Sequence, residues 1–234
     1  AQRHGRCPEL GWSHGCHLPF RYPRRVVSKS ILLLRIRILS RVVPVRRDRV
    51  VLASARADRL VGNLAHVHAA IRRERPDLRT VVLMETYSYS LAGRVAYLLR
   101  LLRGTYYLTT SATVVIDNAY LPVHVVPRRP GVRVVQVWHA AGALKKFGHD
   151  SVDDGERAED RVLHLGYDLV VASSETTADH YATAFATPRD RVVALGSPRA
   201  EFFADAAAVA AARERVLARH PELVGRRCVL YAPT

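Results

Sequence analysis

A histidine and two lysines stand close together in the middle of this 234-residue chain. His139 follows the apolar run Val134–Val137, and Lys145 and Lys146 come six and seven residues after it. The lysines stand out because only three of the 36 Lys and Arg residues are Lys. A lysine ammonium is a compact charge suited to phosphate, and a histidine can take up a proton near neutral pH. The spacing indicates proton transfer on a phosphorylated substrate, with a surface turn bearing solvated lysines as the alternative.

These residues need a scaffold, and the surrounding pattern predicts a parallel α/β sheet. Short Val-rich runs without polar alternation are typical of strands buried on both faces. Such runs occur over residues 50–54, 80–84, 112–117, 133–138, 168–172 and 191–195. Apolar residues at helical spacing fall between and after them, over about 58–75, 91–103, 153–165, 175–185 and 201–219. We therefore expect a Rossmann-like parallel sheet with helices on both faces.

Single residues predict where some of these elements begin and end. The Asp58 side chain is suited to cap the first helix, and Pro76 ends that helix. Gly104 is expected to close the second helix. The stretch between the third and fourth strands is expected to be a loop because it contains three prolines, Pro122, Pro127 and Pro130.

Three polar turns follow predicted strands. They are Trp138–Lys146 after the fourth strand, Ser173–Glu175 after the fifth and Gly196–Arg199 after the sixth. Ligands of open parallel sheets bind at the carboxyl ends of the strands, where helix N-termini also meet. We therefore expect the three turns to converge on one site.

The positive charge is concentrated at the amino end. The net charge is +15, and residues 1–48 hold eleven Lys and Arg against two acids, a net +9. Such an arm is suited to an anionic surface. The apolar run Ile31–Leu39 is too short and too basic to cross a membrane, but it can lie at the interface or form the first element of the fold. We expect an anionic membrane surface as a partner, and no nucleic acid, because no stripe of aromatic residues and cations marks the globular part.

The cysteine and histidine content predicts neither a disulfide framework nor a metal site. Three cysteines are too few for such a framework, which is typical of a cytosolic protein. The amino-terminal His and Cys residues fit no zinc spacing, so we interpret them as part of a disordered arm: His4, Cys7, His14, Cys16 and His17.

Three motifs in order resemble the CDP-glycerol glycerophosphotransferases of teichoic-acid synthesis. Gln136–Lys146 is similar to the Trp-His-Gly-x-x-x-Lys-Lys signature of that family, and Gly196–Glu201 to its Gly-x-Pro-Arg-x-Asp turn. Val229–Thr234 is similar to the Leu-Tyr-Ala-Pro-Thr strand that opens its second domain. Two positions depart from the pattern: Ala140 replaces a glycine, and Glu201 replaces an aspartate. The resemblance covers about residues 46–234.

The resemblance implies a two-domain GT-B fold, of which this chain holds the amino-terminal, acceptor-side half. We expect a basic arm over residues 1–45, a Rossmann-like domain over 46–224 and the first strand of a truncated donor-binding domain over 225–234. The chain is thus expected to be an incomplete fragment without the residues that grip CDP, and inactive alone.

The implied reaction moves glycerol phosphate from CDP-glycerol to a membrane-linked acceptor and releases CMP, at the cytoplasmic face of the cell membrane. No cofactor is implied beyond the donor substrate. The resemblance makes His139 the general base, with a buried structural histidine as the alternative. The same carry-over gives the residues expected to bind substrate or phosphate: Trp138, Gly142, Lys145, Lys146, Ser173, Arg199 and Glu201.

Other functions remain open at this point. A nucleotide-sugar glycosyltransferase or epimerase would share the architecture, and its second half would distinguish it. The high isoelectric point of about 10.5 leaves a basic nucleic-acid-binding module as a rival from another class. The sequence does not separate glycerol from ribitol phosphate, or a primase from a polymerase.

Overall fold

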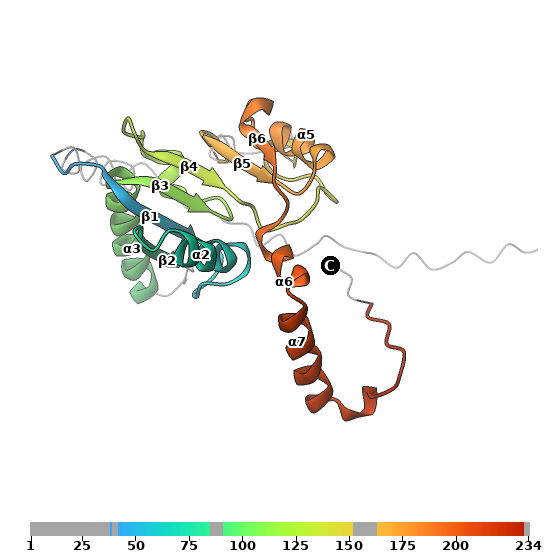
Figure 1. Ribbon diagram of the computed structural model, residues 1–234. Helices are drawn as coiled ribbons and strands as arrows, with labels where there is room; N and C mark the ends of the chain where they lie inside the picture. Colours follow the sequence, from blue (N-terminus) through green and yellow to red (C-terminus); the bar gives the residue numbers. More distant parts are fainter. Residues whose placement is uncertain (1–37, 39–41, 85–90, 152–162, 232–234) are drawn as a thin grey trace, which may run out of the picture.

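The computed structural model describes residues 38, 42–84, 91–151 and 163–231, which form a six-stranded parallel sheet in the order β2-β1-β3-β4-β5-β6 (Figure 1). The strands have these bounds: β1 Arg46–Ser54, β2 Arg79–Met84, β3 Ser111–Ile116, β4 Arg133–Gln136, β5 Leu169–Ala172 and β6 Val192–Ala194. All five pairings are parallel. The six strands expected from the Val-rich runs are confirmed, and with them the Rossmann-like α/β class.

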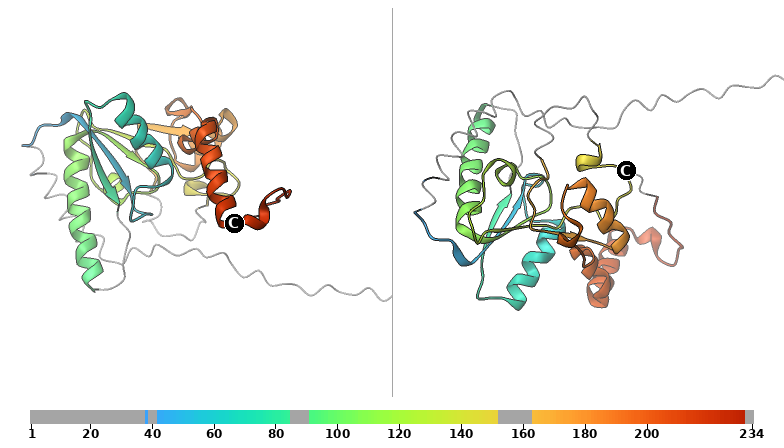
Figure 2. Two further views of the ribbon diagram at one scale, coloured as in Figure 1. Left: turned by 60° about the horizontal axis from the view of Figure 1, so that its bottom comes forward. Right: turned by 90° about the horizontal axis from the view of Figure 1, so that it is seen from above.

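Helices cover both faces of this sheet, and Figure 2 shows α2 and α3 on opposite sides of it. The helices have these bounds: α2 Gly62–Glu74, α3 Leu91–Thr110, α4 Leu121–Val125, α5 Glu175–Ala184, α6 Glu201–Ala204 and α7 Ala206–Arg219. Alternate strand residues point to opposite faces, so each face has its own apolar cluster. On one face Val51 and Ala53 of β1 pack with residues of α3, α4 and α5. On the other face Val50 and Leu52 pack with α2.

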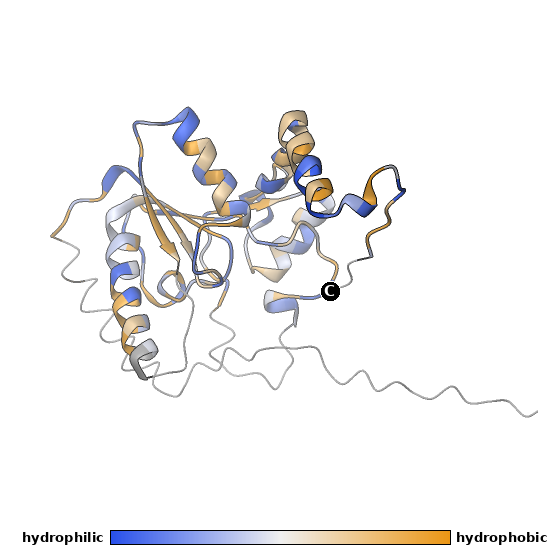
Figure 3. Cartoon of the chain, turned by 90° about the horizontal axis from the view of Figure 1, so that it is seen from below, coloured by the Kyte–Doolittle hydropathy of each residue, from blue (hydrophilic) through white to orange (hydrophobic). Residues whose placement is uncertain are grey.

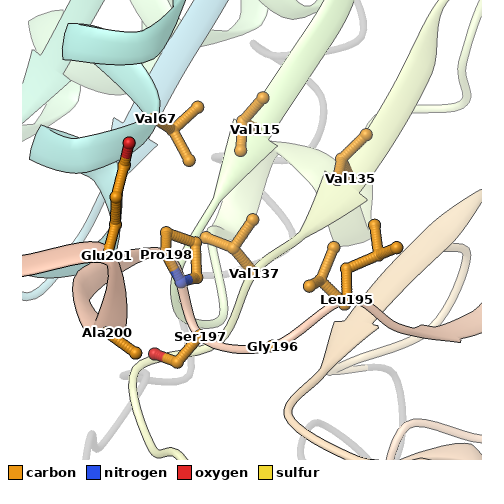
Figure 4. A pocket seen from close by; sticks show the side chains of 11 residues that line it. Val67, Val115, Val135, Val137, Leu195, Gly196, Ser197, Pro198, Ala200 and Glu201 are labelled. Atoms are coloured by element: carbon orange, nitrogen blue, oxygen red, sulfur yellow. The ribbon is translucent and has the colours of Figure 1, made fainter. Parts of the chain in front are cut away.

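The α2 face is covered only in part. Beyond α2 an apolar pocket of about 580 Å³ opens over β4, β5 and the turn that follows β6 (Figure 4). Val135 and Val171 line its floor, and Pro198 and Glu201 of that turn line its edge. Helix α7 comes after this turn but projects away from the sheet, and none of its residues is buried (Figure 1).

Four predicted boundaries are wrong. Helix α2 begins at Gly62 after Val61 and has no side-chain cap, so Asp58 does not cap it. Helix α3 does not end at Gly104 but continues to Thr110. The glycine has a packing role instead, because a Cβ there would overlap the Tyr120 hydroxyl. The predicted proline-rich loop contains α4, which tolerates Pro122 in its first turn because that position needs no backbone donor.

The long helix expected over residues 201–219 is interrupted at Asp205. The Asp205 side chain accepts a hydrogen bond from the backbone N–H of Ala208 at 2.9 Å and so caps a new helix, α7. The aspartate thereby divides the apolar stretch into α6 and α7.

Three other expectations lie partly outside the described residues. The acidic helix over 153–165 falls mainly on residues 152–162; of its described part, Leu163 and His164 form a turn and Leu165 belongs to no helix. Residues 225–231 form no strand in the described part of the chain, and Val229 and Tyr231 are 89% and 86% exposed. A strand needs a neighbouring strand to satisfy its backbone, so the assignment of 225–234 to a second domain stays a prediction. The arm over 1–45 is described only at residues 38 and 42–45. No described helix is long and apolar enough to cross a membrane.

Candidate functional site

The three polar turns do converge at the carboxyl edge of the sheet. The register aligns Ala53 of β1 with Ile116 of β3, and Ile116 with Gln136 of β4. Three contacts then join the turns: the Ser173 hydroxyl donates to the carbonyl of Ala141, the Arg199 guanidinium donates to the carbonyl of His139, and the Tyr181 hydroxyl donates to the carbonyl of Ala140 at 2.8 Å. The loop after β4 is therefore held by side chains from the loops or helices that follow β5 and β6.

Asn63, near the start of α2, links two of these turns. Its side-chain amide donates to the carbonyls of Val137 at 3.2 Å and Trp138 at 2.7 Å. Its side-chain oxygen accepts from the Ser197 hydroxyl and from the backbone N–H of Arg199, both at 3.2 Å. This buried residue was missed in the sequence, because an isolated asparagine in a helix carries no pattern that reveals such contacts.

His139 lies half-buried at the centre of this edge. Its Nδ1 is 3.2 Å from the carbonyl oxygen of Asp117, which can only accept, so Nδ1 carries the proton and Nε2 keeps its lone pair. Burial lowers the pKa of His139 to about 4; the charge of Arg56 is the next cause, and Arg199 and Lys145 add to it. The imidazole is therefore neutral at pH 7 and available as a base.

Three cations thus surround the histidine, and one was not expected. Arg199 and Lys145 were predicted, whereas Arg56 was missed. Its position two residues beyond the carboxyl end of β1 is the signal that could have found it. Lys146 is exposed and is not among the groups that shift the pKa of His139. Neither lysine forms an ion pair with another described residue.

The Trp138 side chain packs against the core and anchors the loop after β4. Its backbone has φ of +45°, which is unusual for a residue with a side chain. The indole is 6% exposed, stacks on Phe147 with ring centres 5.2 Å apart, and lies 4.1 Å from the His139 ring. Its edge contact with Phe185 of the loop after α5 ties it to the core. Trp138 was assigned to substrate binding, but a buried indole among core rings is placed to position His139 instead.

Three other residues were also predicted to bind substrate, and their surroundings in the structure are as follows. Ser173 uses its hydroxyl on the Ala141 carbonyl and lies 3.2 Å from the Thr177 hydroxyl. Gly142 leaves open space, since the nearest atom to a Cβ there would be 4.0 Å away. Glu201 forms an exposed ion pair of 3.3 Å with Arg73 of α2 and lies at the edge of the apolar pocket (Figure 4). The substrate-binding roles of Ser173, Gly142 and Glu201 stay predictions.

Asp117, which follows β3, contributes both its carbonyl and its carboxyl group to this region. Besides its carbonyl, its carboxyl group is buried, and burial raises its pKa although Ser54 and Arg56 act in the opposite direction. Its Oδ1 atom has no hydrogen-bond partner among the described residues. Asp117, Ser54 and Arg56 therefore lie together on one side of the site, next to His139.

Two further histidines lie beneath the loop. Burial lowers the pKa of His124 to about 4 and that of His164 to about 3. The His164 ring contacts that of Trp138 at 5.5 Å, and its Nδ1 is 3.1 Å from the Tyr167 hydroxyl. Both rings are therefore neutral at pH 7. His164 contacts Trp138 directly, whereas His124 contacts His164, with ring centres 6.1 Å apart.

With this geometry in place, comparisons with known proteins identify the family. A family model described as CDP-Glycerol:Poly(glycerophosphate) glycerophosphotransferase matches residues 36–234. The chain is 32% identical, over 89% of its length, to the teichoic acid ribitol-phosphate primase of Bacillus spizizenii and spans 54% of that protein. It is 25% identical, over 59% of its length, to the teichoic acid glycerol-phosphate primase of Bacillus subtilis and spans 38% of it.

A solved structure agrees on the fold. The wall teichoic acid polymerase TagF superposes with a TM-score of 0.57 at 12% identity, covering 83% of this chain and 50% of that one. The chain thus spans between 38% and 54% of the length of these relatives. Because the family model covers most of the residues and the likeness to the ribitol-phosphate primase extends over nearly all of them, the chain belongs to the CDP-glycerol:poly(glycerophosphate) glycerophosphotransferase family of teichoic acid primases and polymerases.

Proposed function

We propose that this chain supplies the acceptor-side half of a transferase that moves glycerol phosphate from CDP-glycerol to the terminal hydroxyl of a lipid-linked teichoic-acid acceptor, releasing CMP. The observation that carries the proposal is the fixed tautomer of His139. Its Nδ1–H is held by the Asp117 carbonyl, so that the lone pair of Nε2 is left for chemistry. Family membership supplies the substrate class.

The proposed step is a proton transfer coupled to phosphoryl transfer. His139 Nε2 takes the proton of the acceptor hydroxyl, and the oxygen attacks the β-phosphorus of the donor. A new P–O bond forms to the acceptor as the bond to the CMP oxygen breaks. Arg56, Arg199 and Lys145 neutralise phosphate charge during the step. Phosphate near these cations also offsets their effect on His139 and raises its pKa from about 4 towards the working pH.

The other residues have supporting parts in this proposal. Trp138 and Ser173 position the loop, Gly142 keeps it open, and the exposed Lys146 adds a mobile charge for a polyanionic acceptor. Glu201 holds the turn that carries Arg199. The donor half, with its CDP contacts, is proposed to lie in sequence that the chain does not contain.

Ribitol phosphate is the second candidate for the transferred unit. The ribitol-phosphate primase of Bacillus spizizenii is 32% identical over 89% of the chain, against 25% over 59% for the glycerol-phosphate primase of Bacillus subtilis. The His139 site is on the acceptor side in either case, so the same mechanism serves both donors.

The test measures the pKa of His139 by NMR in the chain, with and without an oligomer of glycerol phosphate. We expect the oligomer to raise the pKa of His139 by about one unit or more, because it neutralises the surrounding cations. An unchanged His139 pKa in the presence of saturating oligomer would overturn the acceptor assignment. In a second arm, CDP-glycerol and CDP-ribitol are each added with acceptor. CMP release by this chain alone would overturn the assignment of the donor site to another region.

A further inference from the structure

One oxygen of the Asp117 carboxyl group has no hydrogen-bond partner among the described residues. Asp117 is 8% exposed, and its Oδ1 atom is buried. Figure 3 shows the strands of the sheet mainly in orange, so this group lies at the edge of an apolar layer. A buried carboxylate oxygen without a partner is costly to the fold. Such a group needs an explanation other than stability, and a part in the chemistry of a site is one.

Two strand ends connect this carboxyl group to a cation and to the base. At the end of β1 the Ser54 hydroxyl oxygen accepts a hydrogen bond from the backbone N–H of Arg56 at 3.2 Å, and the same hydroxyl donates to the Asp117 carboxylate. At the end of β4 the Nδ1 atom of His139 is 3.2 Å from the carbonyl oxygen of Asp117. The carboxylate therefore belongs to the residue that orients the base.

The surroundings of His139 are otherwise positive. The described charges that act on its pKa come from three cations: Arg56, Arg199 and Lys145. The ring of His164, which also faces His139, is neutral because burial lowers its pKa to about 3. Burial raises the pKa of Asp117, but Ser54 and Arg56 both favour its ionised form. Asp117 therefore brings a negative charge into a group of cations.

We propose that Asp117 is a positioning residue of the transferase whose carboxylate limits the affinity of the site for polyanions and partly offsets the cations when His139 takes up a proton. It acts through the charge of the site and not by touching the substrate. This inference rests on the proposed function, because it assigns Asp117 a part in the same proton transfer.

Removal of this charge is expected to move binding and catalysis in opposite directions. A carboxylate repels a nearby phosphate, so Asp117→Asn should strengthen the binding of a polyanion. The same substitution removes an anion beside the imidazolium, so the pKa of His139 should fall and the base should weaken. This second effect is expected with ligand bound, because in the empty site the ring, with a pKa of about 4, titrates close to the carboxyl group.

The test uses the full chain with tripolyphosphate as the probe. Calorimetry measures the affinity, and NMR follows the pKa of His139. We expect Asp117→Asn to bind the probe about three- to tenfold more tightly and to lower the pKa of His139 in its presence by about half a unit or more. The matched control is Asp190→Asn, the same change of charge at an exposed residue just before β6, at the other edge of the sheet. It should change the affinity by less than about twofold.

Two further measurements separate charge from structure. Asp117→Asn keeps the backbone carbonyl, so the nitrogen chemical shifts of His139 should still report a proton on Nδ1. Ser54→Ala removes a hydrogen bond to the carboxylate but leaves its charge, and should change the probe affinity by less than about twofold. In a complete enzyme that contains this domain, Asp117→Asn should lower both the acceptor KM and kcat, whereas a purely structural aspartate would not lower KM.

Three results would overturn the inference. The first is probe binding by Asp117→Asn that is no tighter than that of the unchanged chain, including no measurable binding by either. The second is an equal pKa of His139 in the two proteins with the probe bound. The third is a lost His139 tautomer or an equally large effect of Ser54→Ala, which would make the aspartate structural. The proposed function fails on another result. If a glycerol phosphate oligomer leaves the His139 pKa unchanged while tripolyphosphate still distinguishes Asp117→Asn, only the acceptor assignment is wrong.

Discussion

The loop Trp138–Lys146 after β4 makes more contacts with the rest of the domain at its beginning than at its end. At its beginning, Trp138 and His139 contact the core, the Asp117 carbonyl, Asn63 and Arg199. At its end, Leu144 is fully exposed, and the lysines that follow pair with no other described residue. The same short motif therefore contains an imidazole, that of His139, held by a hydrogen bond, and two lysine side chains that no ion pair with a described residue holds in place. A general base needs a fixed position because it takes a proton from one particular atom. A lysine can bind a polyanion without a fixed position, because its long side chain can adjust to the phosphate.

Loss of the fixed base gives the largest expected effect. In a complete enzyme that contains this domain, we expect His139→Ala to lower kcat about 10²- to 10⁴-fold with little change in the acceptor KM. Steady-state kinetics measures both, with His139→Gln as the isosteric control that keeps a donor but loses the base. A kcat near normal would contradict the role of base, and loss of the fold by circular dichroism would make His139 structural.

Removing the support beneath the histidine is expected to cost stability as well. Trp138→Ala deletes a buried indole, and such deletions lower the free energy of unfolding by about 3–5 kcal/mol. The control at the free end is Leu144→Ala, which should change it by less than about 0.5 kcal/mol. Urea denaturation compares the two. Similar values for both variants would show that the two ends of the loop are not held differently.

Acid is expected to weaken the fixed region specifically. The pKa of His124 is lowered to about 4 and that of His164 to about 3, so the unfolded chain binds protons on both before the folded chain does. Stability is therefore fully present above about pH 6.5 and falls towards pH 4, by up to about 1.4 kcal/mol per pH unit for each histidine. Urea midpoints at several pH values measure the slope. His124→Gln should reduce the slope, and an unchanged slope would contradict the burial of this ring.

Asn63→Ala tests the hydrogen bonds of Asn63 separately from the packing of the aromatic rings beneath the loop. It leaves the carbonyls of Val137 and Trp138 without their amide partner, which costs about 1–3 kcal/mol. In the complete enzyme we also expect a lower kcat, because Arg199 and His139 lose their common support. Asn63→Asp, which keeps the acceptor for Ser197 but not the amide donor, should be intermediate. Equal stability of Asn63→Ala and the unchanged protein in urea would show that the hydrogen bonds of Asn63 do not stabilise the fold.

The smallest effects are expected at the free end. Lys145→Ala and Lys146→Ala should each raise the KM for a polyanionic acceptor by less than about tenfold, and the effect should shrink as salt increases. Lys145 should have the larger effect, because it alone of the two acts on the pKa of His139. Kinetics at two ionic strengths tests this order. A fall in kcat as large as that of His139→Ala would mean that the lysines also require a fixed position.

The sequence predicted the strands well because burial on both faces imposes an apolar run that tertiary contacts do not alter. Helix boundaries were predicted less well. Gly104 resembles a terminator, yet it lies inside its helix, where the Tyr120 hydroxyl leaves no room for a Cβ. Asp205 was hidden in an Ala-rich stretch, although it is a cap.

The candidate site divides in the same way. His139, Lys145 and Arg199 were predicted because each follows a strand in a recognisable turn. Arg56, Asp117 and Asn63 act through partners far away in the chain, and no local spacing reveals such contacts. The burial of Trp138 was not predicted, since a motif shows that a residue matters and not which way its ring points.

The bond between His139 and the Asp117 carbonyl also bears on how each turnover ends. A carboxylate in that place would stabilise the imidazolium, but a carbonyl orients the ring without neutralising it. With three cations nearby, the protonated ring is an unfavourable state that lasts only briefly. The departing CMP carries a phosphate whose second pKa is about 6, and it can accept this proton. In the proposed reaction, proton transfer from His139 to CMP therefore regenerates the base, and CMP then carries the proton away as it departs.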